Sequence, residues 1–281
     1  MKIAAFYENI LDGARKSGIS VLDAVKSLKK EGLELLYLSG FSYEENPGAI
    51  EDLVKAAEIG VEGLYMFYDF GENPEDTGYE KLIDAAVRLG GKNVLLVPGM
   101  LPKGTSYREQ KLTNMVNAFK RAVAYGQQKG IDVCVEDFDG LDSPLCTVDG
   151  VDYFMKAVPG IKCAFDTGNF ALHKEDEVRA FERFKGALGT VHLKDRSLTG
   201  RYPDDQCKVC ADGSRVYAEV TGSGYIHMEE IMKRLKEMGY PGNVVVELYD
   251  YSPEHMLEAI AASIRWTAAH RCFQCTKASL R

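Results

Sequence analysis

Three acids and one histidine recur in similar contexts in the second half of the chain. Glu136 lies in CVEDF, Asp166 in AFDTG, His192 in TVHLKD and Glu247 in VVVELY. Each belongs to a short run of apolar, β-branched residues, the composition of a buried strand. One such acid alone is often a helix N-cap or a solvated loop residue. Together, three carboxylates and an imidazole form the ligand set of a divalent cation, with Mn²⁺ or Mg²⁺ favoured and Co²⁺ or Zn²⁺ as alternatives.

A repeated unit of strand, polar loop and amphipathic helix must position these residues. Strand starts lie about 30 residues apart for most of the sequence, which is the length of one βα unit. Strands that are apolar throughout are typical of a parallel sheet covered on both faces. Eight such units predict an α/β fold, a (β/α)8 TIM barrel that forms a single domain over residues 1–281. The predicted strands are Ile3–Tyr7, Leu33–Leu38, Gly63–Phe67, Asn93–Val97, Ile131–Glu136, Ile161–Asp166, Thr190–Leu193 and Val244–Glu247.

In such a barrel, the carboxyl ends of the strands converge on one face, where the active site lies. Glu136, Asp166, His192 and Glu247 belong to the fifth to eighth predicted strands, which are neighbours around the wall. We therefore expect all four side chains to bind one metal ion at that face. The longest irregular segment, residues 195–224, follows the seventh strand and is predicted to lie over the same face.

The composition indicates a globular protein with an acidic balance. Lys and Arg number 34 against 42 Asp and Glu, a formal net charge of −8, which disfavours a nucleic-acid partner. Glu8 and Asp12 interrupt any apolar signal region at the N-terminus, and no run is long enough for a membrane span. The cysteines number seven, an odd count scattered along the chain, which fits a reducing compartment. We expect a cytoplasmic protein with no membrane partner.

Five segments of the sequence resemble one known family. They are VEDF, FDTGN, HLKDR, the GSG segment before the seventh predicted helix, and GYPGNVVVELY. The resemblance spans nearly the whole chain and is to the sugar phosphate isomerase/epimerase group of the xylose-isomerase-like TIM barrels. It implies that Glu136, Asp166, His192 and Glu247 are the metal ligands. It also implies that Glu136 and Glu247 act as catalytic acid and base on opposite faces of the substrate.

The activity that the resemblance implies is isomerisation or epimerisation of a small polyhydroxylated carbonyl compound. A proton next to the carbonyl is abstracted, and the metal stabilises the enediolate. Return of the proton to the opposite face gives an epimer, whereas return to the adjacent carbon gives an isomer. The same four residues serve both outcomes. Family members are often dimers or tetramers, so a homo-oligomer is an open expectation.

Three alternative functions are weighed against this one. An inosose-type dehydratase would use the same proton abstraction, followed by loss of water. A non-catalytic barrel would bind metal and sugar but leave substrate protons unexchanged in D₂O. DNA repair of the endonuclease IV type is disfavoured, because that enzyme uses histidines from earlier strands. This chain has five histidines, and the first of them is His173.

Substrate contacts are expected from Asn169, Lys194 and Arg196, which lie close to the ligands in sequence. Many relatives have a histidine three residues after the sixth-strand aspartate, where this chain has Asn169. An amide binds hydroxyl groups but is a poor metal ligand. Lys194 and Arg196 follow His192 and can bind hydroxyl, carboxylate or phosphate groups, or form an internal ion pair. His173 could take the place of that histidine from the neighbouring loop, but it is expected on the surface of the loop.

Several further features have two interpretations each. The turn Gly222–Gly224 can bind an anion or simply turn the chain, and phosphate specificity is not supported because no phosphate loop with a lysine is visible. The pairs Cys207/Cys210 and Cys272/Cys275 have zinc-like spacing, but a ribbon that joins them is disfavoured because they would lie at opposite ends of the barrel. The aromatic residues that can wall the pocket or fill the core are Phe6, Tyr7, Tyr37, Phe67 and Tyr68.

Overall fold

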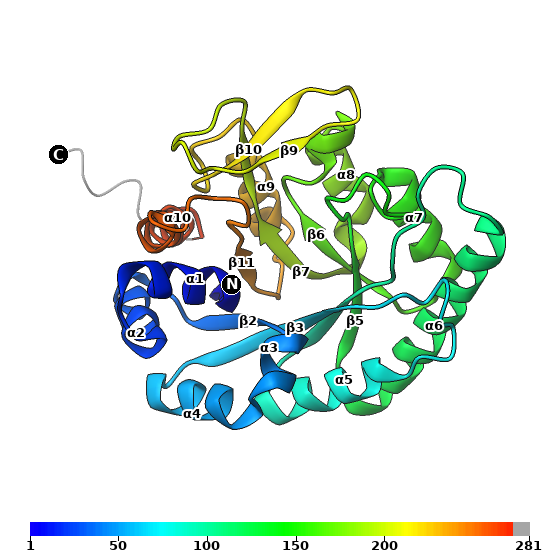
Figure 1. Cartoon of the computed structure of the whole chain (residues 1–281), viewed down its shortest axis with the longest axis horizontal. Helices are drawn as coiled ribbons and strands as arrows, with labels where there is room; N and C mark the ends of the chain where they lie inside the picture. The colour runs from blue at the N-terminus through cyan, green and yellow to red at the C-terminus, as the bar shows by residue number, and fades with distance from the viewer. Residues whose placement is uncertain (272–281) are drawn as a thin grey trace.

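Eight parallel strands form a closed barrel in the computed structural model, which describes residues 1–271 (Figure 1). Each strand pairs with its predecessor around the wall, and the last strand pairs with the first. The predicted (β/α)8 TIM barrel is confirmed, and all eight predicted strands are present with small shifts at their ends. The strands are β1 (Ile3–Phe6), β2 (Leu35–Ser39), β3 (Gly60–Phe67), β4 (Asn93–Val97), β5 (Asp132–Glu136), β6 (Lys162–Asp166), β7 (Leu188–Leu193) and β11 (Val244–Val246).

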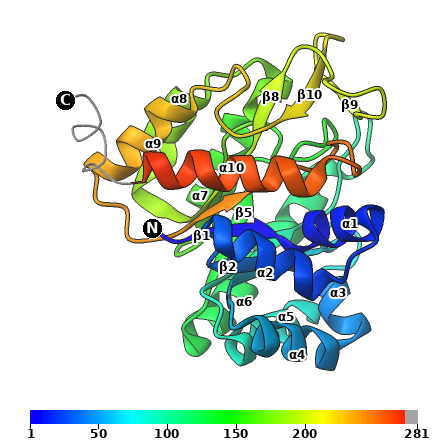
Figure 2. The same cartoon turned by 90° about the vertical axis from the view of Figure 1, so that its left-hand side faces the viewer.

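Helices cover the outside of the barrel, and their ends follow local sequence signals. The Ser20 hydroxyl accepts a hydrogen bond from the N–H of Asp23 at 3.1 Å where α2 begins, and Gly32 ends α2 with a φ of 114°. The last helix, α10, lies beside α1 and α2 and completes the outer layer (Figure 2). The α-helices are α1 (Tyr7–Ser17), α2 (Val21–Glu31), α3 (Gly40–Glu45), α4 (Pro47–Ala57), α5 (Gly78–Leu89), α6 (Arg108–Lys129), α7 (Val148–Ala157), α8 (Glu177–Phe184), α9 (Met228–Glu237) and α10 (Met256–His270).

The core has two parts because side chains alternate along each strand. In β1, Ile3 and Ala5 face outward and pack in the layer between strands and helices. Ala4 and Phe6 face inward and pack inside the barrel with residues such as Tyr37. The barrel interior is therefore filled by side chains, and a binding site can form only at its mouth.

The segment between β7 and α9, predicted to be irregular, contains a three-stranded antiparallel sheet (Figure 1). Its strands are β8 (Asp195–Ser197), β9 (Cys207–Val209) and β10 (Arg215–Glu219), with β10 in the middle, and we call it the accessory sheet. The turn between β9 and β10 contains Asp212 and Gly213, and Gly213 has a φ of 84°. An Asp-Gly pair before the alternating run RVYAE is a hairpin signal, but such short strands give little periodicity.

The structure also bears on the expectations about membrane spans and cysteine pairs. None of the helices within residues 1–271 has the length and hydrophobicity that a membrane span needs. Cys207 and Cys210 are free thiols, and Cys210 is buried. Cys272 and Cys275 lie outside the described residues, so the prediction about the two cysteine pairs stays a prediction, as does a single domain that extends to residue 281.

Candidate metal centre

The strand register explains why acidic side chains reach the mouth of the barrel. Cys134 in β5 and Ala164 in β6 pack inside the barrel. The residues two positions further along, Glu136 and Asp166, therefore also point inward, but at the carboxyl end of the wall. Glu247 stands in the same relation to the inward-facing Val245 of β11.

A tight turn after β6 fixes Asp166 through one oxygen and leaves the other without a hydrogen bond. Oδ1 of Asp166 accepts hydrogen bonds from the N–H groups of Gly168 at 2.7 Å and Asn169 at 2.9 Å. Glycine is required at 168, because a Cβ there would lie 2.5 Å from the carbonyl oxygen of Lys194. The Thr167 hydroxyl donates to that same carbonyl and accepts from the N–H of Lys194, each at 2.9 Å. The DTGN sequence thus joins the tips of β6 and β7 and presents Oδ2 of Asp166.

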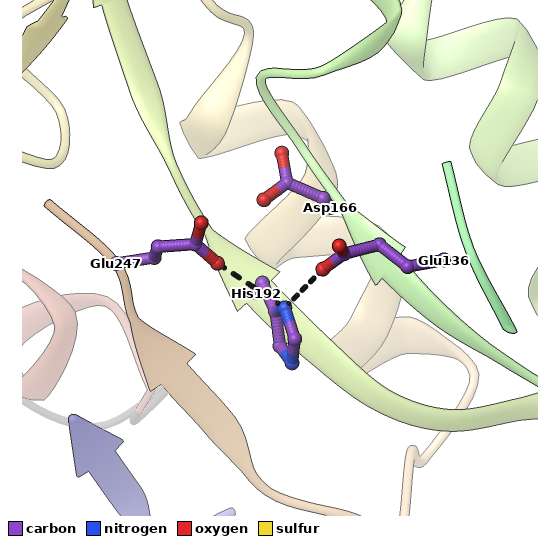
Figure 3. A group of neighbouring side chains, drawn as sticks. All are labelled: Glu136, Asp166, His192 and Glu247. Atoms are coloured by element: carbon purple, nitrogen blue, oxygen red, sulfur yellow. Dashed lines mark hydrogen bonds and ion pairs between the residues drawn. The ribbon is translucent and has the colours of Figure 1, made fainter. Parts of the chain in front are cut away.

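The structure brings together all four predicted ligands (Figure 3). Nδ1 of His192 lies 2.7 Å from Oε1 of Glu136 and 3.2 Å from Oε2 of Glu247. Together with a carboxylate oxygen of Asp166, these ligand atoms all lie within 4.8 Å of one another. All four side chains are buried, and among the described residues this is the one group of three or more such side chains that is compact enough to hold a metal ion.

The chemistry of this group fits a divalent cation. Oδ2 of Asp166 and Oε2 of Glu247 are buried and accept no hydrogen bond of good geometry, although Lys194 Nζ lies 3.7 Å from the first oxygen and His192 Nδ1 lies 3.2 Å from the second. Buried acceptors without partners are rare and cost free energy, so such a pair points to a group that binds them. Carboxylate oxygens with one imidazole nitrogen suit Mn²⁺, Mg²⁺, Co²⁺ or Zn²⁺, and the structure does not discriminate among them.

A cavity of about 260 Å³ opens above the group. Glu136 and Glu247 line it, whereas Asp166 and His192 lie beneath. The lining combines charged side chains with apolar and aromatic ones. The remaining lining residues are Phe6, Tyr65, Phe67, Leu95, Val97, Phe138, Asp139, Lys194, Lys208, Tyr249 and Asp250.

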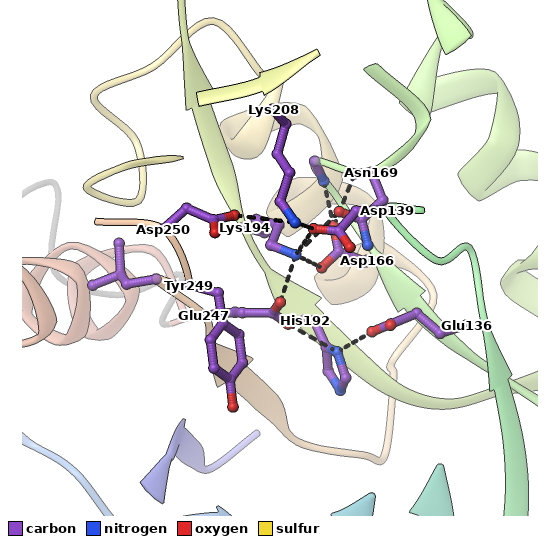
Figure 4. A network of polar contacts seen from close by, with 12 residues as sticks. Glu136, Asp139, Asp166, Asn169, His192, Lys194, Lys208, Glu247, Tyr249 and Asp250 are labelled. Atoms are coloured by element: carbon purple, nitrogen blue, oxygen red, sulfur yellow. Dashed lines mark hydrogen bonds and ion pairs between the residues drawn. The ribbon is translucent and has the colours of Figure 1, made fainter. Parts of the chain in front are cut away.

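Of the three predicted substrate contacts, only Lys194 lines the cavity. Figure 4 shows Lys194 beside Glu247 and Asn169. Its Nζ lies 2.5 Å from Oε1 of Glu247 and 3.1 Å from Oδ1 of Asn169. Arg196 is fully buried, and its Nη2 donates to the same Asn169 oxygen at 3.2 Å. Asn169 and Arg196 therefore lie behind Lys194, with the Asn169 oxygen accepting from both cations.

Residues 22–270 match the family model of the xylose isomerase-like TIM barrel. The chain belongs to this family. Among curated proteins, inosose dehydratase from Lacticaseibacillus casei is similar to it, with 28% identity over 89 residues. That match covers 31% of this chain and 30% of the relative's length, so the activity of the relative does not follow from it.

Solved structures of low sequence identity share the fold of this xylose isomerase-like barrel. The IOLI protein, solved with a zinc atom, has a TM-score of 0.73 and 18% identity, and the match covers 96% of this chain and 98% of that one. The probable 3-DHS dehydratase AsbF from Bacillus anthracis has a TM-score of 0.71 and 16% identity, covering 95% and 99%. D-allulose 3-epimerase from Methylomonas sp. has a TM-score of 0.71 and 14% identity, covering 97% of each chain.

Burial and mutual interactions shift the pKa values of the four side chains. Burial opposes the charge on His192, but hydrogen bonds and charges from Glu136 and Glu247 outweigh it and raise the pKa of His192 to about 10. Burial also opposes the charge on Glu247, but Lys194 and His192 lower its pKa to about 2. Burial raises the pKa of Glu136, and it raises the pKa of Asp166 well above its usual range.

Metal binding is expected to release at least one proton at neutral pH. In the metal-free protein the raised pKa keeps the His192 imidazole protonated, whereas a metal ligand must be neutral at the ligating nitrogen. Metal affinity should therefore rise by at least about tenfold per pH unit between pH 6 and 8. Calorimetric titration with Mn²⁺ in two buffers of different ionisation enthalpy counts the released protons. A pH-independent affinity with no proton release would contradict this electrostatic picture.

The structure also bears on the Gly222–Gly224 turn, on His173 and on the aromatic candidates. Oδ2 of Asp195 accepts hydrogen bonds from the N–H groups of Gly222 at 2.8 Å and Gly224 at 2.9 Å, so a carboxylate of the chain already binds this turn. His173 is half-buried rather than on the surface, and it does not line the cavity. Of the five aromatic candidates, Phe6 and Phe67 line the cavity, whereas Tyr7, Tyr37 and Tyr68 do not.

The residues that sequence reasoning missed come mainly from loops and from the accessory sheet. Asp139 follows β5, and Lys208 extends from β9 to within 3.2 Å of it (Figure 4). Tyr249 lies two residues after Glu247 and so points to the same side, a period-two signal that was available. Tyr65 alternates in the same way with Phe67 in β3.

Proposed function

We propose that this protein is a divalent-metal-dependent isomerase or epimerase of a small polyhydroxylated carbonyl compound. The observation that carries the proposal is the four-residue group at the base of the cavity, in which two buried carboxylate oxygens accept no hydrogen bond from the described residues. The proposed ligands are Glu136, Asp166, His192 and Glu247. Membership of the family supports this function, since its solved relatives include a D-allulose 3-epimerase.

The two glutamates are suited to move protons on the two faces of one bound molecule. Both line the cavity, and they lie on opposite sides of His192 (Figure 3). When bound at this group, a divalent cation supplies Lewis-acid stabilisation of the negative charge that develops as a proton leaves the carbon next to a carbonyl. One glutamate takes the proton and the other returns a proton from the opposite face. Asp166 and His192, which lie beneath the cavity, hold the site without taking part in the transfer.

Lys194 stabilises the negative charge of one of the two glutamates. Its ammonium group lies 2.5 Å from Glu247 and stabilises the ionised form of that carboxyl, which a base requires. The apolar lining residues, among them Phe6, Phe67 and Phe138, limit the access of water to the reacting carbon.

A dehydratase is the second candidate function. The curated relatives are inosose dehydratases, and a probable 3-DHS dehydratase shares the fold. Proton abstraction by a glutamate is the first step of this reaction as well, and a hydroxide then leaves from the adjacent carbon. Lys194 lines the cavity and can donate a proton or a hydrogen bond to that leaving group.

Incubation with a panel of ketoses and inososes in D₂O separates these functions. Protein reconstituted with Mn²⁺ is expected to incorporate deuterium at one carbon of its substrate, as followed by NMR. A new stereoisomer or aldose identifies the isomerase or epimerase, and loss of water identifies the dehydratase. Saturating binding of metal and sugar with no exchange across the panel would instead indicate a binding protein.

A further inference from the structure

The basic side chains around the cavity are already paired with acids. Nζ of Lys194 lies 2.5 Å from Oε1 of Glu247. Oδ2 of Asp139 lies 3.2 Å from Nζ of Lys208 and 3.6 Å from Nη2 of Arg196. Lys208 also lies 3.5 Å from Asp250 on its other side (Figure 4). Within the described part of the chain, the cavity therefore offers an anionic ligand no lysine or arginine without a carboxylate partner.

The balance of charge around the cavity also disfavours an anion. Carboxylates outnumber the basic side chains by two among the charged residues of the metal group, the cavity wall and the layer behind Lys194. A bound divalent cation would bring this set to neutrality and no further. A phosphate or carboxylate ligand would therefore meet no excess of positive charge. The carboxylates are those of Glu136, Asp139, Asp166, Glu247 and Asp250, and the basic residues are Lys194, Arg196 and Lys208.

Elsewhere on the wall, two tyrosines form a polar patch among aromatic side chains. The hydroxyls of Tyr65 and Tyr249 lie 2.6 Å apart, and both residues line the cavity. Both rings pack edge-on against Phe6, with centroid distances of 5.5 Å for Tyr65 and 5.2 Å for Tyr249. The neighbouring lining residues Leu95 and Val97 are apolar, so this pair is the natural contact for a polar group on that side of a ligand.

Glu8 interacts with Tyr65 and can favour one direction for the hydrogen bonds of the pair. Oε1 of Glu8 accepts from the N–H of Ser39 and the hydroxyl of Ser42, each at 2.9 Å, while Oε2 is buried without a partner. Burial raises the pKa of Glu8; in its ionised form the carboxylate can only accept, and it then favours donation from Tyr65 toward Glu8 and from Tyr249 toward Tyr65. Lone pairs of the Tyr249 oxygen then remain for a hydroxyl donor. Deprotonated phosphate and carboxylate oxygens have no proton to offer there.

We propose that the cavity binds an uncharged polyhydroxylated molecule, neither phosphorylated nor a carboxylic acid, with one hydroxyl on the Tyr65–Tyr249 pair and its reacting end at the four-ligand group. The contact of the reacting end with the four-ligand group rests on the proposed function. It gives the tyrosine pair a role in selecting the substrate and assigns no chemical step to it.

Three molecules with the same six-carbon chain test the charge preference: sorbitol, gluconate and sorbitol 6-phosphate. Calorimetric titration of the Mn²⁺-saturated full-length protein is expected to show sorbitol binding at least about ten times more tightly than either anion. Tighter binding of gluconate or sorbitol 6-phosphate would overturn the inference. So would a failure of all three to bind while Mn²⁺ remains bound. Failure of Mn²⁺ itself to bind would instead refute the proposed function.

Tyr65→Phe and Tyr249→Phe test the hydroxyl contact. Each is expected to weaken sorbitol binding by about fivefold, the effect of one hydrogen bond, and to change glycerol binding by less than about twofold, since glycerol has few hydroxyls beyond the metal end. Tyr68→Phe is the matched control, because the Tyr68 hydroxyl is buried without a partner and does not line the cavity. Equal effects of the three variants, or no effect of the first two, would overturn the assignment of the pair.

Discussion

Replacement of Glu136 or Glu247 by Gln is expected to lower the rate of substrate proton exchange by about 10²–10⁴-fold, the usual contribution of a general acid or base. Both side chains are at most slightly exposed and line the cavity, so they are in position to reach a bound molecule. An amide of the same size keeps an oxygen for hydrogen bonding but cannot take up a proton near neutral pH. Exchange is measured by NMR in D₂O at saturating Mn²⁺, with elemental analysis to verify metal content.

A matched substitution separates loss of chemistry from damage to the barrel. Glu62 is a buried glutamate near the amino end of β3, where it accepts hydrogen bonds from Asn93 at 3.1 Å and Asn243 at 2.6 Å. Glu62→Gln should cost stability but leave exchange within about threefold of wild type. If Glu136→Gln and Glu247→Gln both retain more than about a tenth of the wild-type rate while holding metal, the acid and base lie elsewhere.

The sequence was sufficient for the barrel and for the convergence of the four predicted ligands. Apolar strands with about 30-residue spacing allow few arrangements, and once the barrel is given, the tip of each strand must lie at its mouth. The turn after Asp166 was also readable in outline, since an Asp followed by Thr, Gly and Asn is typical of such turns. These inferences depend only on chain order and on the two-residue period of strands.

Contacts made by loops could not be placed in the same way. Lys208 lies far along the chain from Asp139, and their ion pair depends on how the accessory sheet folds back to the cavity. By contrast, Asn169 and Arg196 are close to the predicted ligands in sequence, and this closeness suggested substrate contact. In the structure they lie behind Lys194 and do not line the cavity. Residues that are close to a site in sequence need not be exposed to it.

Metal binding is expected to raise the thermal stability of the wild-type protein and to be lost in Asp166→Asn. At a metal concentration one hundred times the Kd, binding adds about 2.7 kcal/mol, which corresponds to a rise in Tm of about 5–10 °C. Asp166 isolates metal binding from acid–base chemistry, since it lies beneath the cavity. In Asp166→Asn the remaining oxygen can still accept from Gly168 and Asn169, so the turn persists while the second metal-binding oxygen is replaced.

Without metal, Asp166→Asn is expected to be at least as stable as the wild-type protein. Burial and neighbouring carboxylates raise the pKa of Asp166 well above its usual range, so an ionised Asp166 destabilises the empty site. Asp166→Asn removes that charge, and its Tm without metal should equal or exceed that of wild type. Thermal unfolding with EDTA and with added Mn²⁺, Mg²⁺, Co²⁺ or Zn²⁺ measures both effects, with the exposed Asp52 as control, since Asp52→Asn should behave like wild type. A wild-type Tm that is unmoved by every one of these ions would mean that the buried acids serve some purpose other than metal binding.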